Sequence, residues 1–189
     1  MEKQNIKETI KKKAVEIFSE KGFHGTSVRE IAKASQCSLP MLYYYYNNKN
    51  DLFEEVAYNE FILLIERLNT SITLGVPLID IYYQAIKQRM ELNPYDKGVY
   101  KLSLKVWLGF DGSKEVRDKL MKWENERLNR NKKILAKACP NIEILSVFSS
   151  IMIRIIENMI EKIILLDEVI SDEEIKKELY FMLESVKRK

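Results

Sequence analysis

Residues 26–49 read TSVREIAKASQCSLPMLYYYYNNK, and this stretch predicts two short helices joined by a tight turn. Ser27 and Glu30 stand in the order of a capping box, in which the serine hydroxyl accepts an early helical N–H. Ser38 offers a second N-cap, and Pro40 falls in the first helical turn, where no N–H bond is lost. Two short helices with such a connection are typical of a helix-turn-helix, whose second helix enters the major groove of DNA.

Further residues in and around this stretch follow a defined order: Gly22-Phe23, Thr26-Ser27-Val28, Ile31-Ala32, Ser38, Leu42-Tyr43, Tyr45 and Lys49-Asn50-Asp51-Leu52. This order resembles the N-terminal domain of the tetracycline-repressor (TetR) family of transcriptional regulators. The resemblance implies an all-α chain of about nine helices. It places a three-helix DNA-binding domain at residues 1–48 and a helical ligand-binding and dimerisation domain at residues 49–189.

The resemblance also implies a set of phosphate contacts. Lys49 follows Asn48, a predicted N-cap, so helical N–H groups and the lysine ammonium would converge on one phosphate. Thr26, Ser38, Tyr43 and Tyr44 are transferred as further phosphate or near-phosphate positions. The complete predicted DNA-binding set is Thr26, Ser27, Arg29, Ser38, Leu39, Pro40, Met41, Tyr43, Tyr44 and Lys49.

Base reading departs from the usual pattern of the family. Family members often carry a polar residue, a glycine and a threonine where Leu39, Pro40 and Met41 stand here. These three side chains can make only apolar contacts, for example with thymine methyl groups. Arg29 is the long donor placed to reach a guanine. The sequence therefore predicts a site with G and T at defined positions.

Two further features of the motif carry structural expectations. Tyr43–Tyr46 cannot all face one way on a helix, so we expect Tyr45 to pack inward with Leu42, and Tyr43 and Tyr44 to face DNA. The alternative is that all four tyrosines pack as core and rim. Gln36 stands where the family usually has glycine in a left-handed turn, and a glutamine held there would cost about 1 kcal/mol or more. Either the turn differs slightly in this chain or the surrounding packing holds it.

The net charge of +3 is unevenly distributed. Residues 1–50 hold nine Lys/Arg against five Asp/Glu, a net of +4, and the remainder holds 22 against 23, a net of −1. A basic excess on the motif segment is the footprint expected for a polyanion, although a solvated basic face would look the same. The run Lys11-Lys12-Lys13 fits either reading.

The rest of the composition argues against other classes of protein. Cys37 and Cys139 are far apart and form no metal-binding pattern, and the N-terminal residues lack the apolar segment of a secretory signal. The most apolar stretch is interrupted by charges, so we expect no membrane span and a cytoplasmic protein. With a single histidine, His24, and no Gly-rich phosphate loop, we expect no enzyme, metal or cofactor.

Helical periodicity continues to the end of the chain. We expect helices at residues 49–68, 77–90, 99–108, 113–138, 142–166 and 172–188. The helix at 142–166 is apolar around most of its circumference, which requires burial on both sides. A homodimer through the last two helices provides that cover and two half-site readers, as the family implies. The alternative is an internal helix of a monomer.

Through the family, the middle helices predict a cavity for a small inducer. The candidate ligand-binding residues are Phe61, Tyr82, Tyr83, Tyr100, Trp107, Phe110, Arg154 and Asn158. Any one aromatic among them fits a plain core equally, and Arg154 and Asn158 also fit a dimer rim. The predicted function is a homodimeric repressor, released from a double-stranded DNA operator by an apolar or amphipathic ligand. The alternative is the same fold without an inducer, controlled by a protein partner.

Overall fold

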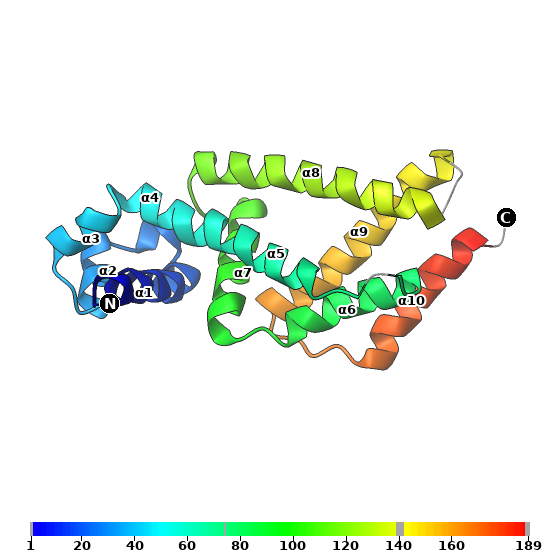
Figure 1. Ribbon diagram of the computed structural model, residues 1–189, viewed down its shortest axis with the longest axis horizontal. Helices are drawn as coiled ribbons and strands as arrows, with labels where there is room; N and C mark the ends of the chain where they lie inside the picture. The colour runs from blue at the N-terminus through cyan, green and yellow to red at the C-terminus, as the bar shows by residue number, and fades with distance from the viewer. Residues whose placement is uncertain (1, 74, 139–141, 188–189) are drawn as a thin grey trace. The chain divides into compact units, whose positions relative to one another are not determined.

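The computed structural model describes residues 2–73, 75–138 and 142–187, and every regular element in these ranges is helical (Figure 1). In chain order the elements are α1 (Glu2–Gly25), α2 (Val28–Ala34), α3 (Leu39–Tyr45), α4 (Lys49–Glu54), the π-helical segment η1 (Glu55–Asn59), α5 (Glu60–Thr70), α6 (Leu78–Met90), α7 (Pro94–Trp107), α8 (Lys114–Ala138), α9 (Ile142–Leu165) and α10 (Asp172–Lys187). Because α4, η1 and α5 follow one another without a break, the described ranges hold nine continuous helices. The predicted all-α fold is confirmed. Cys139 lies outside the described residues.

The helices group into two compact units. The first consists of Met1–Glu66 and Asn93–Lys122, and the second of Arg67–Leu92 and Trp123–Lys189. The first unit thus joins α1 to α4, η1 and most of α5 to α7 and the start of α8. The predicted functional division at residues 48 and 49 stays a prediction.

The core of the first unit is built on α1. Ile10, Ala14 and Phe18 of α1 are fully buried, and their spacing of four residues places them on one face of the helix. α2, α3 and α4 pack against α1. Their buried side chains include Ile31, Leu42, Leu52 and Phe53.

α7 runs along α1 inside the first unit. A Cβ on Gly98 of α7 would stand only 2.8 Å from Cγ1 of Val15, so the close approach of the two helices requires glycine there. Further along, Lys105 Nζ donates to the Ser19 carbonyl oxygen at 2.6 Å. Val15 and Ser19 are four residues apart, so α7 follows one face of α1.

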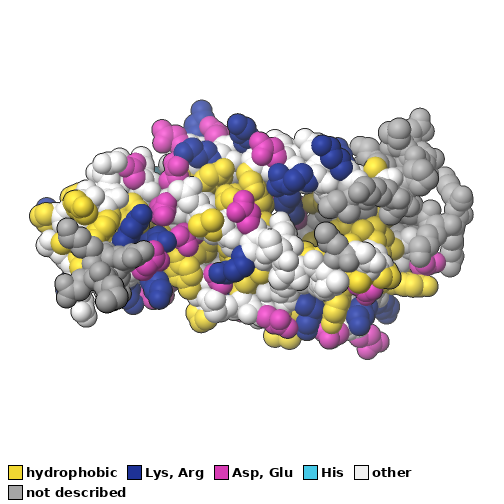
Figure 2. Space-filling model, in the orientation of Figure 1, with side chains coloured by type: hydrophobic (Ala, Val, Ile, Leu, Met, Phe, Trp, Pro, Cys, Tyr) yellow, Lys and Arg dark blue, Asp and Glu magenta, His cyan; other side chains and the backbone are white. Residues whose placement is uncertain are grey.

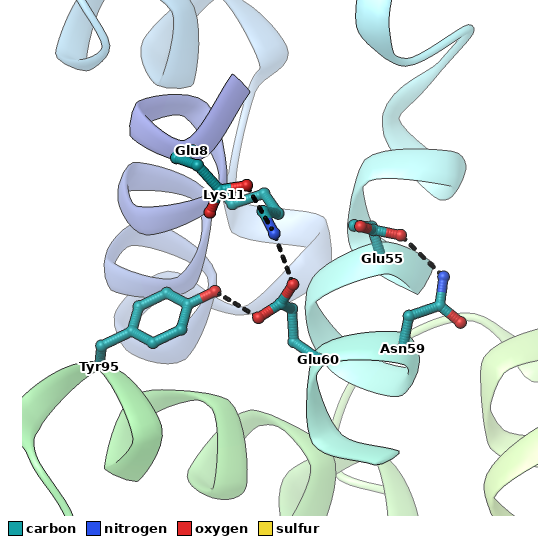
Figure 3. A network of polar contacts seen from close by, with 6 residues as sticks. All are labelled: Glu8, Lys11, Glu55, Asn59, Glu60 and Tyr95. Carbon is teal, nitrogen blue, oxygen red and sulfur yellow. Dashed lines mark hydrogen bonds and ion pairs between the residues drawn. The ribbon is translucent and has the colours of Figure 1, made fainter. Parts of the chain in front are cut away.

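A mostly buried polar network joins α1, α5 and α7 (Figure 3). Lys11 Nζ lies 2.6 Å from Glu60 Oε1 and 3.1 Å from Glu8 Oε1, and the Tyr95 hydroxyl donates to Glu60 Oε2 at 2.9 Å. Burial alone would lower the pKa of Lys11, but its hydrogen bonds to the two carboxylates hold that pKa above the ordinary value. One carboxylate, that of Glu60, therefore ties three helices together.

The π-helical segment η1 also contacts α7. A π turn leaves backbone carbonyls away from their usual partners. The Ser103 hydroxyl of α7 lies 2.7 Å from the Ala57 carbonyl oxygen and 2.9 Å from that of Val99. This hydroxyl is buried, so it satisfies a carbonyl that water does not reach.

In the second unit, α6 packs against both α9 and α10. The fully buried side chains of these three helices include Ile86, Met152, Ile164, Ile175 and Leu179. The start of α10 is tied to α6 by an ion pair in which Lys87 Nζ lies 2.8 Å from Asp172 Oδ1. Within the described ranges, every helix is too short or too rich in charge to span a bilayer.

α9 has a buried face and an exposed face. Phe148, Met152 and Ile156 are buried, whereas Val147 and Ile151 are exposed although both are aliphatic. On α10, Tyr180 and Phe181 are likewise exposed. α9, which is predicted to be apolar around most of its circumference, therefore has apolar side chains that the rest of the chain does not cover.

Candidate DNA-binding surface

The turn between α2 and α3 has the geometry of a Schellman C-terminal cap. Gln36 takes a left-handed conformation with φ of 53°. Its N–H donates to the Lys33 carbonyl at 3.1 Å, and the Cys37 N–H donates to the Ala32 carbonyl at 3.0 Å. These two bonds close the last turn of α2 and direct the chain into α3. Of the two alternatives for Gln36, the structure has the left-handed turn, held in place by its surroundings.

Side-chain caps start each helix of the motif and the helix after it. The hydroxyls of Ser27 and Ser38 and the side-chain oxygen of Asn48 each accept the backbone N–H three residues later, at 3.1, 3.3 and 2.9 Å. All three predicted N-caps are confirmed. The carboxylate of Glu30 pairs with the Lys21 ammonium, which ties the start of α2 to the end of α1.

The four tyrosines at the end of α3 have different environments. Tyr43 and Tyr44 are 45% and 69% exposed, which the predicted contact with DNA requires. Tyr45 is half-buried and meets the Tyr44 ring edge-on. The prediction that Tyr45 takes the inward place is wrong in one respect, because Tyr46 is the more buried residue, at 6% exposure. Tyr46 is the C-cap of α3 with an extended backbone, which turns its side chain away from the helical surface and beside Lys7.

The other predicted DNA contacts divide by exposure. Ser27, Arg29, Ser38 and Pro40 are exposed, and Leu39 and Met41 are half-buried. Figure 2 shows hydrophobic side chains, a colour class that includes tyrosine, at the surface of the first unit near α3.

Thr26 differs from the other predicted contacts. It is buried, and its hydroxyl donates to the Gly22 carbonyl oxygen at 2.7 Å. That bond gives Thr26 a role in holding the turn between α1 and α2. A direct phosphate contact from Thr26 stays a prediction.

Lys49 is the first residue of α4 and is half-buried. Its Nζ lies 4.4 Å from the centre of the Phe23 ring. Burial lowers the pKa of Lys49, and the nearby Asp111 carboxylate acts in the opposite direction. The ammonium is therefore held beside the capped N-terminus of α4, which is the arrangement that the predicted phosphate site needs.

Part of the basic excess of residues 1–50 is engaged inside the protein. Lys11 is buried against Glu60. For this member of the run Lys11-Lys12-Lys13, a position near DNA is therefore excluded. Lys12 on α1, and Arg29 and Lys33 on α2, are exposed. The exposed positive charge of the motif helices thus lies on α2.

The same helices match a known family. Residues 10–56 match the family model described as bacterial regulatory proteins of the tetR family. The chain carries a TetR-family domain. This TetR-family domain takes in most of α1, the two motif helices, α4 and the start of η1.

Curated relatives are similar to this chain over the TetR-family domain. The Bacillus subtilis protein named "Probable HTH-type transcriptional regulator YttP" is 43% identical over 55 residues, which cover 29% of this chain and 27% of the relative. The negative transcriptional regulator IcaR of the biofilm operon icaADBC in Staphylococcus epidermidis is 35% identical over 63 residues, which cover 33% of this chain and 34% of IcaR. The chain therefore matches about a third or less of the length of these relatives.

Solved structures resemble the chain over nearly its whole length. A TetR-like transcriptional regulator from Rhodococcus sp. RHA1 has a TM-score of 0.77 at 17% identity, over 97% of both chains. NalD, the secondary repressor of the MexAB-OprM multidrug efflux pump in Pseudomonas aeruginosa, has a TM-score of 0.66 at 17% identity, over 98% of both chains. At these identities the likeness establishes a shared fold.

The predicted ligand-binding residues are divided between the two units. In the first unit, Phe61 and Tyr100 are buried and meet edge to face, with ring centres 5.2 Å apart. Trp107 is half-buried. Phe110 is 80% exposed in the loop after α7, so it does not line an enclosed space within this unit.

In the second unit, Tyr82 is buried and its hydroxyl donates to Asn131 Oδ1 at 3.2 Å. Tyr83 is half-buried, with Lys176 Nζ 4.6 Å from its ring centre. Arg154 and Asn158 are exposed. The exposure of these two residues fits the dimer-rim alternative better than a ligand cavity.

A polar cluster in the second unit involves residues that are not among the predicted site residues. Arg127 Nη2 lies 2.6 Å from Glu157 Oε1, and Arg127 also pairs through two nitrogens with the buried Glu124. Burial raises the pKa of Glu157 to about 6, with Glu124 adding to the rise and Arg127 opposing it. Glu124 and Arg127 are neighbours on α8, but no sequence signal brings Glu157 of α9 to them.

Proposed function

We propose that this chain is a homodimeric transcriptional repressor that binds a double-stranded DNA operator. The observation that carries the proposal is the capped α2–turn–α3 motif in the TetR-family domain, which presents Pro40, Tyr43 and Tyr44 to solvent. In this motif the second helix, α3, enters the major groove. Repression is favoured over activation because the relative IcaR is a negative regulator.

The predicted contact residues divide into two roles in the proposed complex. Ser38, Tyr43, Tyr44 and Lys49 donate to phosphates and set the position of α3 on the duplex. Arg29 reaches a guanine edge, and the ridge of residues 39–41 contacts thymine methyl groups. Phosphate contacts supply most of the affinity, so binding weakens steeply as salt is raised.

One binding experiment tests this division. We would select a preferred sequence from random duplexes and titrate wild type, Arg29→Ala and Lys49→Ala against selected and scrambled DNA at several salt concentrations. Lys49→Ala should weaken binding to both DNAs by a similar factor and reduce the salt slope by about 1. Arg29→Ala should instead lose about 1–3 kcal/mol of discrimination between them.

Arg130→Ala is the matched control, because it also removes one exposed guanidinium but lies on α8 in the second unit. It should leave both affinities near wild type. The reverse pattern, with Lys49→Ala changing preference and Arg29→Ala weakening all sequences alike, would refute the assigned roles. If the wild-type protein does not bind duplex DNA at low salt, the proposed function is refuted.

Two exposed apolar surfaces support the homodimer. Val147 and Ile151 on α9, and Tyr180 and Phe181 on α10, are exposed although they are aliphatic or aromatic. Apolar groups gathered on one surface are characteristic of interfaces between proteins. Burial of these groups against a second copy gives a two-fold dimer, and a two-fold dimer places two α3 helices on the two halves of an operator.

The ligand part of the proposal rests on the second unit. Tyr82 and Asn131 form a polar contact there, and the shared Arg127 leaves Glu124 and Glu157 with one negative charge in excess. Polar side chains placed beside aliphatic ones are the usual orienting elements of ligand sites. We propose an apolar or amphipathic ligand that favours a dimer with a different separation of its α3 helices.

A melting experiment separates this proposal from its alternative. Ligands that bind the folded state raise the melting temperature in proportion to their occupancy. A panel of neutral, cationic and anionic lipophilic compounds should therefore contain at least one that stabilises the protein and releases DNA. If none does, the reading in which a protein partner controls the same fold is favoured.

A further inference from the structure

α1 has a sharp kink at Gly22, three residues before its end. This residue has φ of 74° and ψ of 174°, a conformation that only glycine adopts readily. A Cβ at this position would also stand 2.8 Å from Asp111 Oδ2. In a Schellman stop, which glycine at a helix end favours, the next N–H would bond to a carbonyl of the same helix.

The N–H of Phe23 has a partner far away in the sequence. It donates to Asp111 Oδ1 at 2.8 Å and to Oδ2 at 3.0 Å, across 88 residues. Asp111 lies in the loop between α7 and α8, where Oδ1 also accepts the Gly112 N–H at 2.7 Å. One carboxylate oxygen therefore joins this loop to the point where α1 turns towards the DNA-reading helices.

The turn held by Asp111 carries several candidate DNA contacts. The Gly22 carbonyl accepts the Thr26 hydroxyl, and Ser27, the N-cap of α2, follows directly. The Phe23 ring lies beneath the Lys49 ammonium and packs edge-on against Phe53 of α4. The position of Phe23 therefore affects both the start of α2 and the start of α4.

The charge of Asp111 acts on the same place. Its carboxylate is close enough to Lys49 to favour the charged ammonium. A DNA phosphate that binds at Lys49 would feel attraction from the ammonium and repulsion from Asp111. The hydrogen-bonding geometry and the charge of Asp111 thus act on DNA binding in opposite directions.

We propose that Asp111 is a positioning residue for DNA binding, which fixes the turn at Phe23 through hydrogen bonds while its charge restrains phosphate attraction at Lys49. The proposal rests on the proposed DNA-binding function and adds a residue outside the TetR-family domain to it. Because Asp111 follows α7, a shift of this loop would change both the turn and the local charge.

Two variants separate geometry from charge. Asp111→Asn keeps Oδ1, which accepts both the Phe23 and Gly112 N–H groups, but removes the negative charge. Asp111→Ala removes both. Asp118→Asn is the control, since Asp118 is an exposed carboxylate on α8 of the first unit, and its change alters the net charge equally.

Amide hydrogen exchange and DNA titration of the full chain are the two measurements. In Asp111→Ala the Phe23 amide should exchange at least about tenfold faster than in wild type, and affinity for the selected duplex should fall by about tenfold. In Asp111→Asn the amide should stay protected, while affinity at low salt should rise about threefold above that of Asp118→Asn.

The outcomes are separable from failure of the proposed function. If wild type does not bind duplex DNA, the function itself is wrong. If wild type binds but Asp111→Ala leaves Phe23 exchange unchanged, or Asp111→Asn binds no tighter than Asp118→Asn, the role of Asp111 is overturned. If circular dichroism shows that Asp111→Ala is unfolded, the comparison of Asp111→Asn with Asp118→Asn decides the matter alone.

Discussion

Gln36 is the residue with the least favourable backbone conformation in the motif. It holds a left-handed φ of 53° at the C-terminal end of α2, where an L side chain crowds the neighbouring carbonyl. The Schellman bonds formed by the Gln36 and Cys37 N–H groups keep the backbone in this conformation. The strain is therefore offset by the hydrogen bonds that join α2 to α3.

Replacing Gln36 with glycine should stabilise the protein. Gln36→Gly relieves the left-handed strain and should raise the free energy of unfolding by about 1 kcal/mol, as measured by urea denaturation. Ala34→Gly is the control, since Ala34 is exposed in the last turn of α2, and glycine there should lower the same quantity by up to about 1 kcal/mol. Equal destabilisation by both changes would contradict this account.

At the scale of elements, α1, α5 and α7 are joined through a single carboxylate. Glu60 pairs with Lys11 and accepts the Tyr95 hydroxyl, and all three side chains are at least half-buried (Figure 3). The gain from such a pair is offset by the loss of hydration of both charges. Removal of one partner is different, because it leaves the other charge buried and unmatched.

Lys11→Met should therefore lower the free energy of unfolding by about 3 kcal/mol. Adding Glu60→Leu and Tyr95→Phe to that variant should recover most of the loss, since no buried charge is then left without a partner. Lys12→Met, an exposed neighbour on the same helix, should stay within about 0.5 kcal/mol of wild type. Chemical denaturation measures all four proteins, and a triple variant no more stable than Lys11→Met would count against the argument.

At the scale of the whole molecule, α9 and α10 carry apolar side chains that the rest of the chain does not bury. Their exposure is compatible with the predicted dimer through the last two helices. A dimer would also place two α3 helices on the two halves of the proposed operator. Assembly and DNA affinity should consequently be lost together.

Ile151→Asp should disrupt the dimer. A carboxylate in an apolar interface loses its hydration, so the dimer dissociation constant should rise by at least about a hundredfold. Sedimentation velocity would report a monomer at concentrations where wild type is dimeric, with weaker operator binding. Leu63→Asp makes the same chemical change at an exposed residue of α5 and should leave the dimer intact. Wild type that sediments as a monomer would refute the dimer itself.

Local interactions made much of the motif predictable. The caps at Ser27, Ser38 and Asn48 form within a few residues, so residue order alone predicts them. The left-handed turn at Gln36 is also local, but residue order left a different turn open. The all-α fold follows in the same way from helical periodicity and the small number of glycines and prolines.

Tertiary structure decided which of the predicted residues meet. The pairing of Lys11 with Glu60 spans 49 residues, and that of Phe23 with Asp111 spans 88. Nothing in local residue order encodes such pairs, because the first depends on how α5 lies against α1 and the second on how the loop after α7 does. The same holds for the burial of Tyr46 and the exposure of Phe110. The sequence by itself determined the helices and their caps, whereas packing between distant helices determined the surroundings of each candidate site residue.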